Sequence, residues 1–151
     1  MSYPEGEAKL LLLLQGMSQF DRANTSRGDW KPLNSGASDH YAVLRPGPFV
    51  NEADSFGGLG GGEATTTWRT AVEVWQRWKD DAPTMLALEG LVSAVMLHLE
   101  RYPTLGGVCQ SAQVAGGSEM QRRWIEQGGP LWAVQEVYID WQEERFISVA
   151  E

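Results

Sequence analysis

The sequence predicts an α+β fold: an antiparallel or mixed sheet of about four strands, two main helices packed on one face, and a long hairpin arm. Two segments, residues 4–19 and 81–102, place apolar side chains at helical spacing. Two others, residues 65–78 and 131–146, alternate as strands that are long for a small protein. With 151 residues, of which 42% are hydrophobic, the chain is long enough to bury a core as one domain, residues 1–151.

Residues 81–102 give the clearest helix signal. Asp80 or Asp81 is placed to cap the helix, Pro83 falls in its first turn, and Pro103 follows its end. One wide apolar arc predicts burial against the sheet; it contains Met85, Leu88, Leu91, Val92, Val95, Met96 and Leu99.

The same helix carries a second apolar strip made of Leu86, Gly90, Ala94 and Leu97. Gly90 and Ala94 are small enough to let another backbone come close. Two interpretations stay open for this strip. Either another helix or a neighbouring subunit covers it, or the N-terminal helix of the same chain does.

The N-terminal half begins with Ser2 and Glu5 at the spacing of a capping box, followed by a helix over residues 4–19. Residues 21–38 are rich in Asn, Ser, Gly and Asp and predict a loop. Residues 40–44 predict a short strand. We expect the Arg-Pro-Gly-Pro segment at residues 45–48 to end it, because proline cannot continue a strand ladder.

Residues 51–63 contain a glycine-rich run and predict a flexible loop or hairpin tip. The run lacks the Gly-Lys-Ser/Thr ending of a phosphate-binding loop. The strand that follows, residues 65–78, would be about 46 Å long at about 3.3 Å per residue. A compact domain of this size is only about 40 Å across. This strand is therefore expected to bend, to carry a bulge or to project as an arm.

The C-terminal third predicts a strand over residues 107–115 and an ambiguous segment, helical turn or strand, over residues 119–127. Residues 131–146 predict a long strand whose apolar positions change phase between Val134 and Val137. Such a change indicates a bulge or burial on both faces.

Composition limits the function classes. The net charge of −8 argues against a surface built mainly to bind phosphate. A single cysteine, Cys109, is insufficient for an internal disulfide or a cysteine-based zinc site, so a reducing compartment is expected. The leucine run at residues 10–14 is too short to cross a membrane and is a poor signal peptide, because Glu5 and Glu7 precede it.

The candidates for chemistry are weak. Cys109 could pair with His98 or His40 as a thiol and imidazole, but the spacing does not support this. Asp39 and His40 beside Asp54 are a poor metal set in a chain with two histidines. We expect no catalytic residues, no metal and no cofactor, and therefore a protein that is not an enzyme.

The remaining features are typical of assembly: long strands, a helix with two apolar sides and seven tryptophans. The candidate residues for contact with another subunit or partner lie in the helix, the long strands and the glycine-rich loop. They are Leu86, Gly90, Ala94 and Leu97; Trp68, Trp75 and Trp141; and Phe56 and Leu59.

In layout the chain resembles the tail terminator proteins of tailed bacteriophages. The resemblance covers most of the chain and rests on the order of five segments. They are KLLLLLQGM at residues 9–17, HYAVLRPG at 40–47, TTTWRTAVEVWQRW at 65–78, APTMLALEGLVSAVMLHLERYP at 82–103 with a Gly-Gly pair soon after, and WAVQEVYIDWQE at 132–143. The segment at residues 116–130, which contains Trp124, has no clear counterpart in that layout.

The resemblance implies a structural virion protein that forms a hexameric ring, caps the tail tube, stops its polymerisation and joins it to the head connector. Its expected partners are further copies of itself, the tail tube protein and the head–tail connector or neck protein, with no membrane. DNA would pass through the lumen without specific binding, and an acidic lumen would repel its phosphates. The expected location is the tail or neck of the virion, assembled in the host bacterial cytoplasm.

Three alternatives remain. The first is a neck or head-completion connector protein, which differs in partner rather than in chemistry. The second is a small ligand-binding domain with residues 51–63 as a lid over a tryptophan-lined pocket. The third is an adaptor that binds one host protein through the strip Leu86, Gly90, Ala94 and Leu97.

Overall fold

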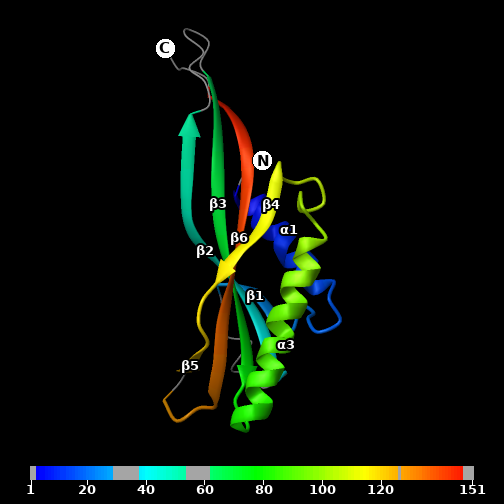
Figure 1. Cartoon of the computed structure of the whole chain (residues 1–151), viewed down its shortest axis with the longest axis vertical. Coiled ribbons are helices and arrows are strands. Elements are labelled where there is room, and N and C mark those ends of the chain that lie inside the picture. Colours follow the sequence, from blue (N-terminus) through cyan, green and yellow to red (C-terminus); the bar gives the residue numbers. More distant parts are fainter. Residues whose placement is uncertain (1–2, 29–37, 54–61, 126, 148–151) are drawn as a thin grey trace.

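The computed structural model describes residues 3–28, 38–53, 62–125 and 127–147, which form an α+β fold with a single mixed sheet (Figure 1). The sheet order is β1-β2-β3-β6-β4, with β5 also paired to β6. In chain order the elements are α1 (Tyr3–Gln15), β1 (Thr25–Arg27), β2 (His40–Ala53), β3 (Gly62–Arg77), α3 (Asp81–Glu100), β4 (Ser111–Gly117), β5 (Gln121–Trp124) and β6 (Leu131–Ile147).

The sheet is built around three long strands. β3 lies between β2 and β6 and is antiparallel to both, so β2 and β6 run in the same direction. The β3–β6 register is continuous from Gly62 opposite Ile147 to Arg77 opposite Trp132. Short strands complete the sheet: β1 is parallel to β2, while β4 and β5 are antiparallel to β6.

Both helices pack on one face of this sheet, as the sequence predicted. α3 buries Leu88, Leu91, Val95 and Leu99, while Met85 on the predicted arc is 41% exposed. Asp80 is the N-cap residue of α3 but makes no side-chain cap hydrogen bond. The core beneath the helices combines residues of α1, α3 and the sheet, among them Leu10, Leu14, Leu44, Val72, Val74, Val137 and Ile139.

The opposite face of the sheet carries a smaller apolar cluster of Tyr41, Val43, Trp75, Trp132 and Val134. This cluster explains the change of phase in β6. Trp132 and Val134 pack on this face, whereas Val137 and Ile139 pack under the helices. Burial on both faces is confirmed, and β6 pairs with β3 without a bulge.

The predicted end of β2 at residues 45–48 is wrong, because the strand continues to Ala53. Pro46 still lies opposite Thr70, and the register shifts between Pro46 and Phe49. The prolines are tolerated because they lie beyond the stretch paired with β1, where the outer side of β2 is a sheet edge. A missing N–H costs little at such an edge.

The sheet has six strands rather than about four. β1 lies within residues 21–38, which were predicted to be a loop, and β5 resolves the ambiguous segment 119–127 as a strand. The predicted loop 51–63 is shorter than expected, since residues 51–53 belong to β2 and residues 62–63 to β3. Residues 54–61 lie outside the described part of the chain.

Candidate functional site

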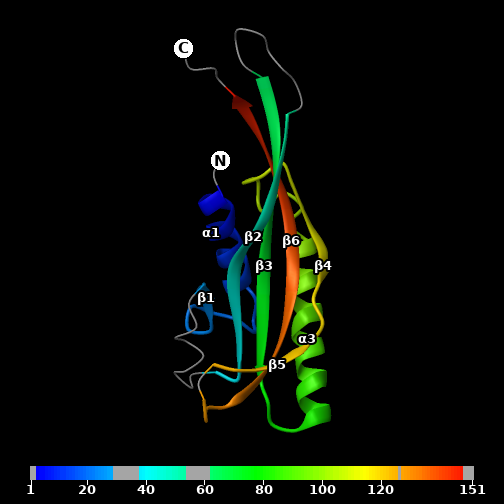
Figure 2. The ribbon, with the colours of Figure 1, turned by 90° about the vertical axis from the view of Figure 1, so that its left-hand side faces the viewer.

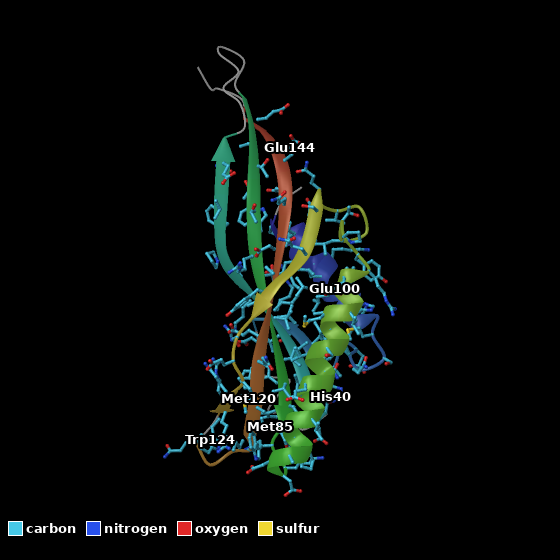
Figure 3. The ribbon with its side chains drawn as sticks, viewed as in Figure 1. His40, Met85, Glu100, Met120, Trp124 and Glu144 are labelled. Carbon is cyan, nitrogen blue, oxygen red and sulfur yellow. The ribbon has the colours of Figure 1, made fainter. Side chains whose placement is uncertain are left out.

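The three long strands extend past the ends of α1 and α3 as an arm (Figures 1 and 2). We define the arm as residues 49–53 of β2, 62–68 of β3 and 143–147 of β6. The arm predicted from strand length is thus present, with β6 as its third strand. Figure 3 shows Glu144 on this arm and Trp124 near the opposite end of the molecule.

The arm differs from the rest of the sheet at its edges. Below the arm, β1 pairs with β2 along Ala42–Leu44, and β4 and β5 cover the outer side of β6 at 137–142 and 131–134. In the described part of the chain, no strand pairs with the outer side of residues 49–53 or 143–147. An open strand edge is a template for pairing with another strand.

An aromatic row crosses the base of the arm on the helix face. Phe49 lies 5.0 Å from Trp68 between ring centroids, and Trp68 lies 6.0 Å from Trp141. Exposure falls along the row: Phe49 is 59% exposed, Trp68 is half-buried and Trp141 is fully buried. The row therefore joins the core of the body to an open edge of the arm.

Trp141 and Trp75, two of the predicted contact residues, are buried inside the subunit. Gly6 of α1 lies directly over the Trp141 ring, so that a Cβ at this position would overlap it. The Trp141 indole N–H donates to Thr70 Oγ1 at 3.4 Å. Trp75, 1% exposed, packs edge-on to Trp132 on the other face. Strand alternation assigns a tryptophan to a face, but it does not show which faces are covered.

The second strip of α3 is largely uncovered. Leu86 is 69% exposed, Leu97 is 62% exposed, and a Cβ at Gly90 would meet no atom within 4 Å. Ala94 alone is half-buried against the core. The N-terminal helix therefore does not cover this strip as a whole, and an apolar surface is left along α3.

A hollow of about 440 Å³ continues this surface where the C-terminal ends of α1 and α3 meet. Ala94, Leu97 and Arg101 line it from the α3 side, with Met17 and Gln19 opposite. The helices are joined there because the Nε2–H of His98 donates to the carbonyl oxygen of Leu13 at 2.7 Å. The hollow has one cationic side chain and an apolar wall.

The face opposite the helices carries an ion cluster that the sequence analysis missed. Glu73, 2% exposed, accepts from Arg45 Nε at 2.8 Å, and Arg123 Nη1 lies 3.6 Å from its other carboxylate oxygen. Strand alternation could have predicted this ion pair, because Arg45 and Glu73 project from the same face of the sheet if β2 continues past residue 44. The expectation that β2 ended there concealed the pair.

Nearer the arm, the Arg69 guanidinium donates two hydrogen bonds, of 2.8 and 3.0 Å, to the carboxylate of Asp140. This bond to a carboxylate raises the pKa of the Arg69 guanidinium. The Tyr138 hydroxyl donates to Glu136 at 2.8 Å, and this bond, together with burial, raises the pKa of Tyr138. Arg45, Arg69, Glu136 and Tyr138 line a shallow hollow of about 370 Å³ beside Pro46 and Pro48.

The residues considered for chemistry have structural contacts. Burial raises the pKa of the Cys109 thiol to about 11, which disfavours the reactive thiolate. The Nε2–H of His40 donates to the carbonyl oxygen of Gln19 at 2.6 Å, and Asp39 pairs with Lys79. Within residues 3–28, 38–53, 62–125 and 127–147 there is no group of three or more potential metal-ligating side chains.

Two predicted contact residues, Phe56 and Leu59, and the proposed metal residue Asp54 lie outside the described residues. In the described part, α3 is the one helix long and apolar enough to cross a membrane by length and composition alone. It packs Leu88 and Val95 against the sheet, and 28% of this apolar stretch is buried.

No family model matches the chain, and no curated protein matches it. The features of this chain that bear on its function are therefore the open edges of the arm, the uncovered strip of α3 and the order of its segments.

Proposed function

We propose that this chain is a structural subunit of a ring, and specifically a tail terminator of a tailed bacteriophage. Such a ring would cap the tail tube, stop its polymerisation and join it to the head connector, with DNA passing through the lumen. The observation that carries the proposal is the arm. Its outer edges are open in the described part of the chain, although short strands cover the same two edges in the body.

The uncovered strip of α3 supports the same proposal. Large exposed apolar side chains such as Leu86 and Leu97 are normal when isolated, but here they lie along one helix on either side of Gly90. A second subunit or a ring partner would cover them. The tail tube protein and the connector are the partners that the tail-terminator layout implies, and the virion is the implied location.

The acidic balance of the chain fits a conduit for DNA. A net charge of −8 disfavours stable binding of phosphate backbones and allows DNA to pass without being held. The proposal is thus of a protein without a catalytic role, a metal or a cofactor, whose function is to join other proteins.

The test is light scattering coupled to size exclusion, with and without purified tail tubes, followed by electron microscopy of tube ends. We expect rings, or a monomer that forms rings at higher concentration or on tube ends. A strict monomer that ignores tail tubes and gains thermal stability with a small ligand would overturn the proposal. A ligand at 100 times its Kd adds about 2.7 kcal/mol, which a metabolite screen would detect.

A neck or head-completion protein is the second candidate, and the same features favour it, because it differs from a tail terminator in partner rather than in chemistry. Partner choice separates the two. Co-purification with filled heads and not with tail tubes would replace the tail terminator with this second assignment.

A further inference from the structure

The two open edges of the arm overlap in height, and the β6 edge lies two residues nearer the tip of the arm than the β2 edge. Residues 49–53 of β2 pair with β3 from Trp68 to Ala64, and residues 143–147 of β6 pair with β3 from Thr66 to Gly62. The two edges overlap along Ala64–Thr66. They also run in the same direction, because β2 and β6 are both antiparallel to β3.

We propose that the outer edge of β2 at residues 49–53 pairs with the outer edge of β6 at residues 143–147 of a second copy, as parallel strands. This inference rests on the proposed ring and names the contact that would build it. Repeated from copy to copy, the pairing would join the arms into one closed sheet with three strands from each subunit.

Symmetry favours this pairing over its alternatives. A contact between two β2 edges, or between two β6 edges, would stop at a dimer and leave the other edge of each subunit open. A β2–β6 contact uses both edges of every copy, and such a head-to-tail contact forms a closed ring when the rotation between copies allows it. Pairing of the full edges sets each copy two residues along the strand from the next, and a closed sheet needs a stagger of this kind because its strands tilt against the axis.

The side chains at the β2 edge point to the same kind of partner. Phe49 is 59% exposed and Val50 is 57% exposed. Because they are adjacent in an extended strand, they project from opposite faces of the arm. A partner lying on one face would cover only one of them. A strand added at the edge brings side chains to both faces and would cover the pair.

Repulsion between carboxylates on the arm disfavours one register of this pairing. Glu52 and Glu144 both lie opposite Thr65, one on each side of β3, so they share one row on one face. Pairing of two copies at equal height would bring Glu144 of one directly opposite Glu52 of the next, and like charges directly opposite are destabilising. Pairing of the full edges, 49–53 with 143–147, places Glu144 opposite Val50 instead. Charged edge residues are a known protection against uncontrolled strand pairing. In that register the two carboxylates still lie two residues apart on one face, so we expect assembly to strengthen as salt screens them.

Disulfide trapping tests the contact directly. In a Cys109→Ser background, Val50→Cys and Glu144→Cys place one thiol on each edge, both on the face that carries Glu52. The two single variants are mixed, oxidised at high salt and run on a denaturing gel. We expect a disulfide-linked dimer in the mixture. The double variant should give a ladder of linked subunits that ends at the size of the ring.

A matched control variant is Leu12→Cys in the same background. Leu12 is 57% exposed, like Val50, but lies on α1 rather than on the arm. It should form no linked dimer with Glu144→Cys. A cross-link with Leu12→Cys as strong as that with Val50→Cys would show random collision and would overturn the assignment.

The remaining outcomes separate this inference from the proposed function. Cross-linking of Val50→Cys with itself alone would show a two-fold β2 contact and overturn the β2–β6 pairing. Rings seen by light scattering without any arm cross-link would also overturn it, while the ring function stands. A chain that stays monomeric at all salt concentrations, with tail tubes present, would reject both.

Discussion

The body and the arm of this molecule use the same three strands in different ways. In the body, the middle of β3 presents Val72 and Val74 to the helices, and Val72 lies opposite Val137 of β6. In the arm, β3 carries a threonine run at residues 65–67. Threonine favours extended backbone through its branched Cβ and does not require an apolar partner. The composition of one strand therefore changes from core to arm without interrupting its ladder.

The two regions also differ in what surrounds the sheet. In the body, helices cover one face and short strands cover the edges, so that the stability of the region comes from within the chain. The arm has open edges in the described part, and its polar contacts include Thr66 Oγ1 donating to Asn51 Oδ1 at 2.8 Å. In the proposed ring, the body would fold by itself and another subunit would complete the arm.

The largest expected effect is on the free energy of unfolding, and it distinguishes the two ends of the aromatic row, Trp141 and Phe49. Trp141→Ala should lower the free energy of unfolding by about 3–5 kcal/mol, because it empties a fully buried site under Gly6. Phe49→Ala, at the exposed end of the row, should change it by less than about 1 kcal/mol. Urea unfolding of the monomer measures both. Equal losses would mean that the arm belongs to the core and that the division is wrong.

The next effect concerns the buried charge on the opposite face. Glu73→Gln removes the carboxylate that faces Arg45 and Arg123 and should cost about 3 kcal/mol, the lower end of the range for a broken buried pair. The lower end applies because the Arg45 side chain is 30% exposed and reaches water.

Asp140→Asn is the matched control for that change. It breaks the more exposed pair with Arg69 and should cost about 1 kcal/mol or less. Thermal unfolding of the wild type and both variants is measured at low and high salt. Salt should reduce the destabilisation caused by Asp140→Asn appreciably, and that caused by Glu73→Gln much less, because exposed ion pairs are screened more than buried ones. If Glu73→Gln were neutral, the ion cluster would not stabilise the body.

The sequence was sufficient to predict the elements whose patterns are long. The helix at residues 81–102 and the strands at 65–78 and 131–146 were found within a few residues, because many side chains repeat their period. It was insufficient where a local signal depends on position in the sheet. The prolines of β2 would end a central strand but are tolerated at an edge, and the sequence does not show which strand is the edge.

The candidate site shows the same limit. The exposed strip at Leu86, Gly90 and Leu97 was recognised as a second apolar side, because helical spacing places residues around the helix independently of context. The tryptophans were not correctly assigned as a group. Trp75 and Trp141 are buried by a strand and a helix that are remote in the sequence, and only tertiary packing reveals that cover.

A smaller effect on stability is expected on α3, where a substitution tests whether the exposed strip takes part in assembly. Gly90→Leu should leave the free energy of unfolding unchanged or raise it by about 0.5–1 kcal/mol, because it replaces a mid-helix glycine in open space. Assembly should nevertheless be impaired if a subunit packs on this strip. Far-UV circular dichroism and light scattering report the two properties separately.

Ala94→Leu is the comparison for that variant. Ala94 is half-buried against the core, so a larger side chain there should also strain the fold. If Gly90→Leu lost helical signal or aggregated, the strip would be part of the core of the chain. If Gly90→Leu still formed rings of the usual size, the strip would have no part in assembly.

The smallest expected effect is a shift in the titration of Tyr138, which lies on the face of the sheet opposite the helices, where the body meets the arm. The Tyr138 hydroxyl bonds to the Glu136 carboxylate, which favours the neutral phenol and raises the pKa of Tyr138. A raised pKa in the folded state contributes stability below the unfolded pKa of about 10, and this contribution is lost as the pH rises through the folded value. Glu136→Gln should therefore move the tyrosinate absorbance change of Tyr138 to lower pH, with a Tyr138→Phe difference spectrum isolating this residue. An unchanged midpoint would mean that burial alone, and not the carboxylate, sets the pKa of Tyr138.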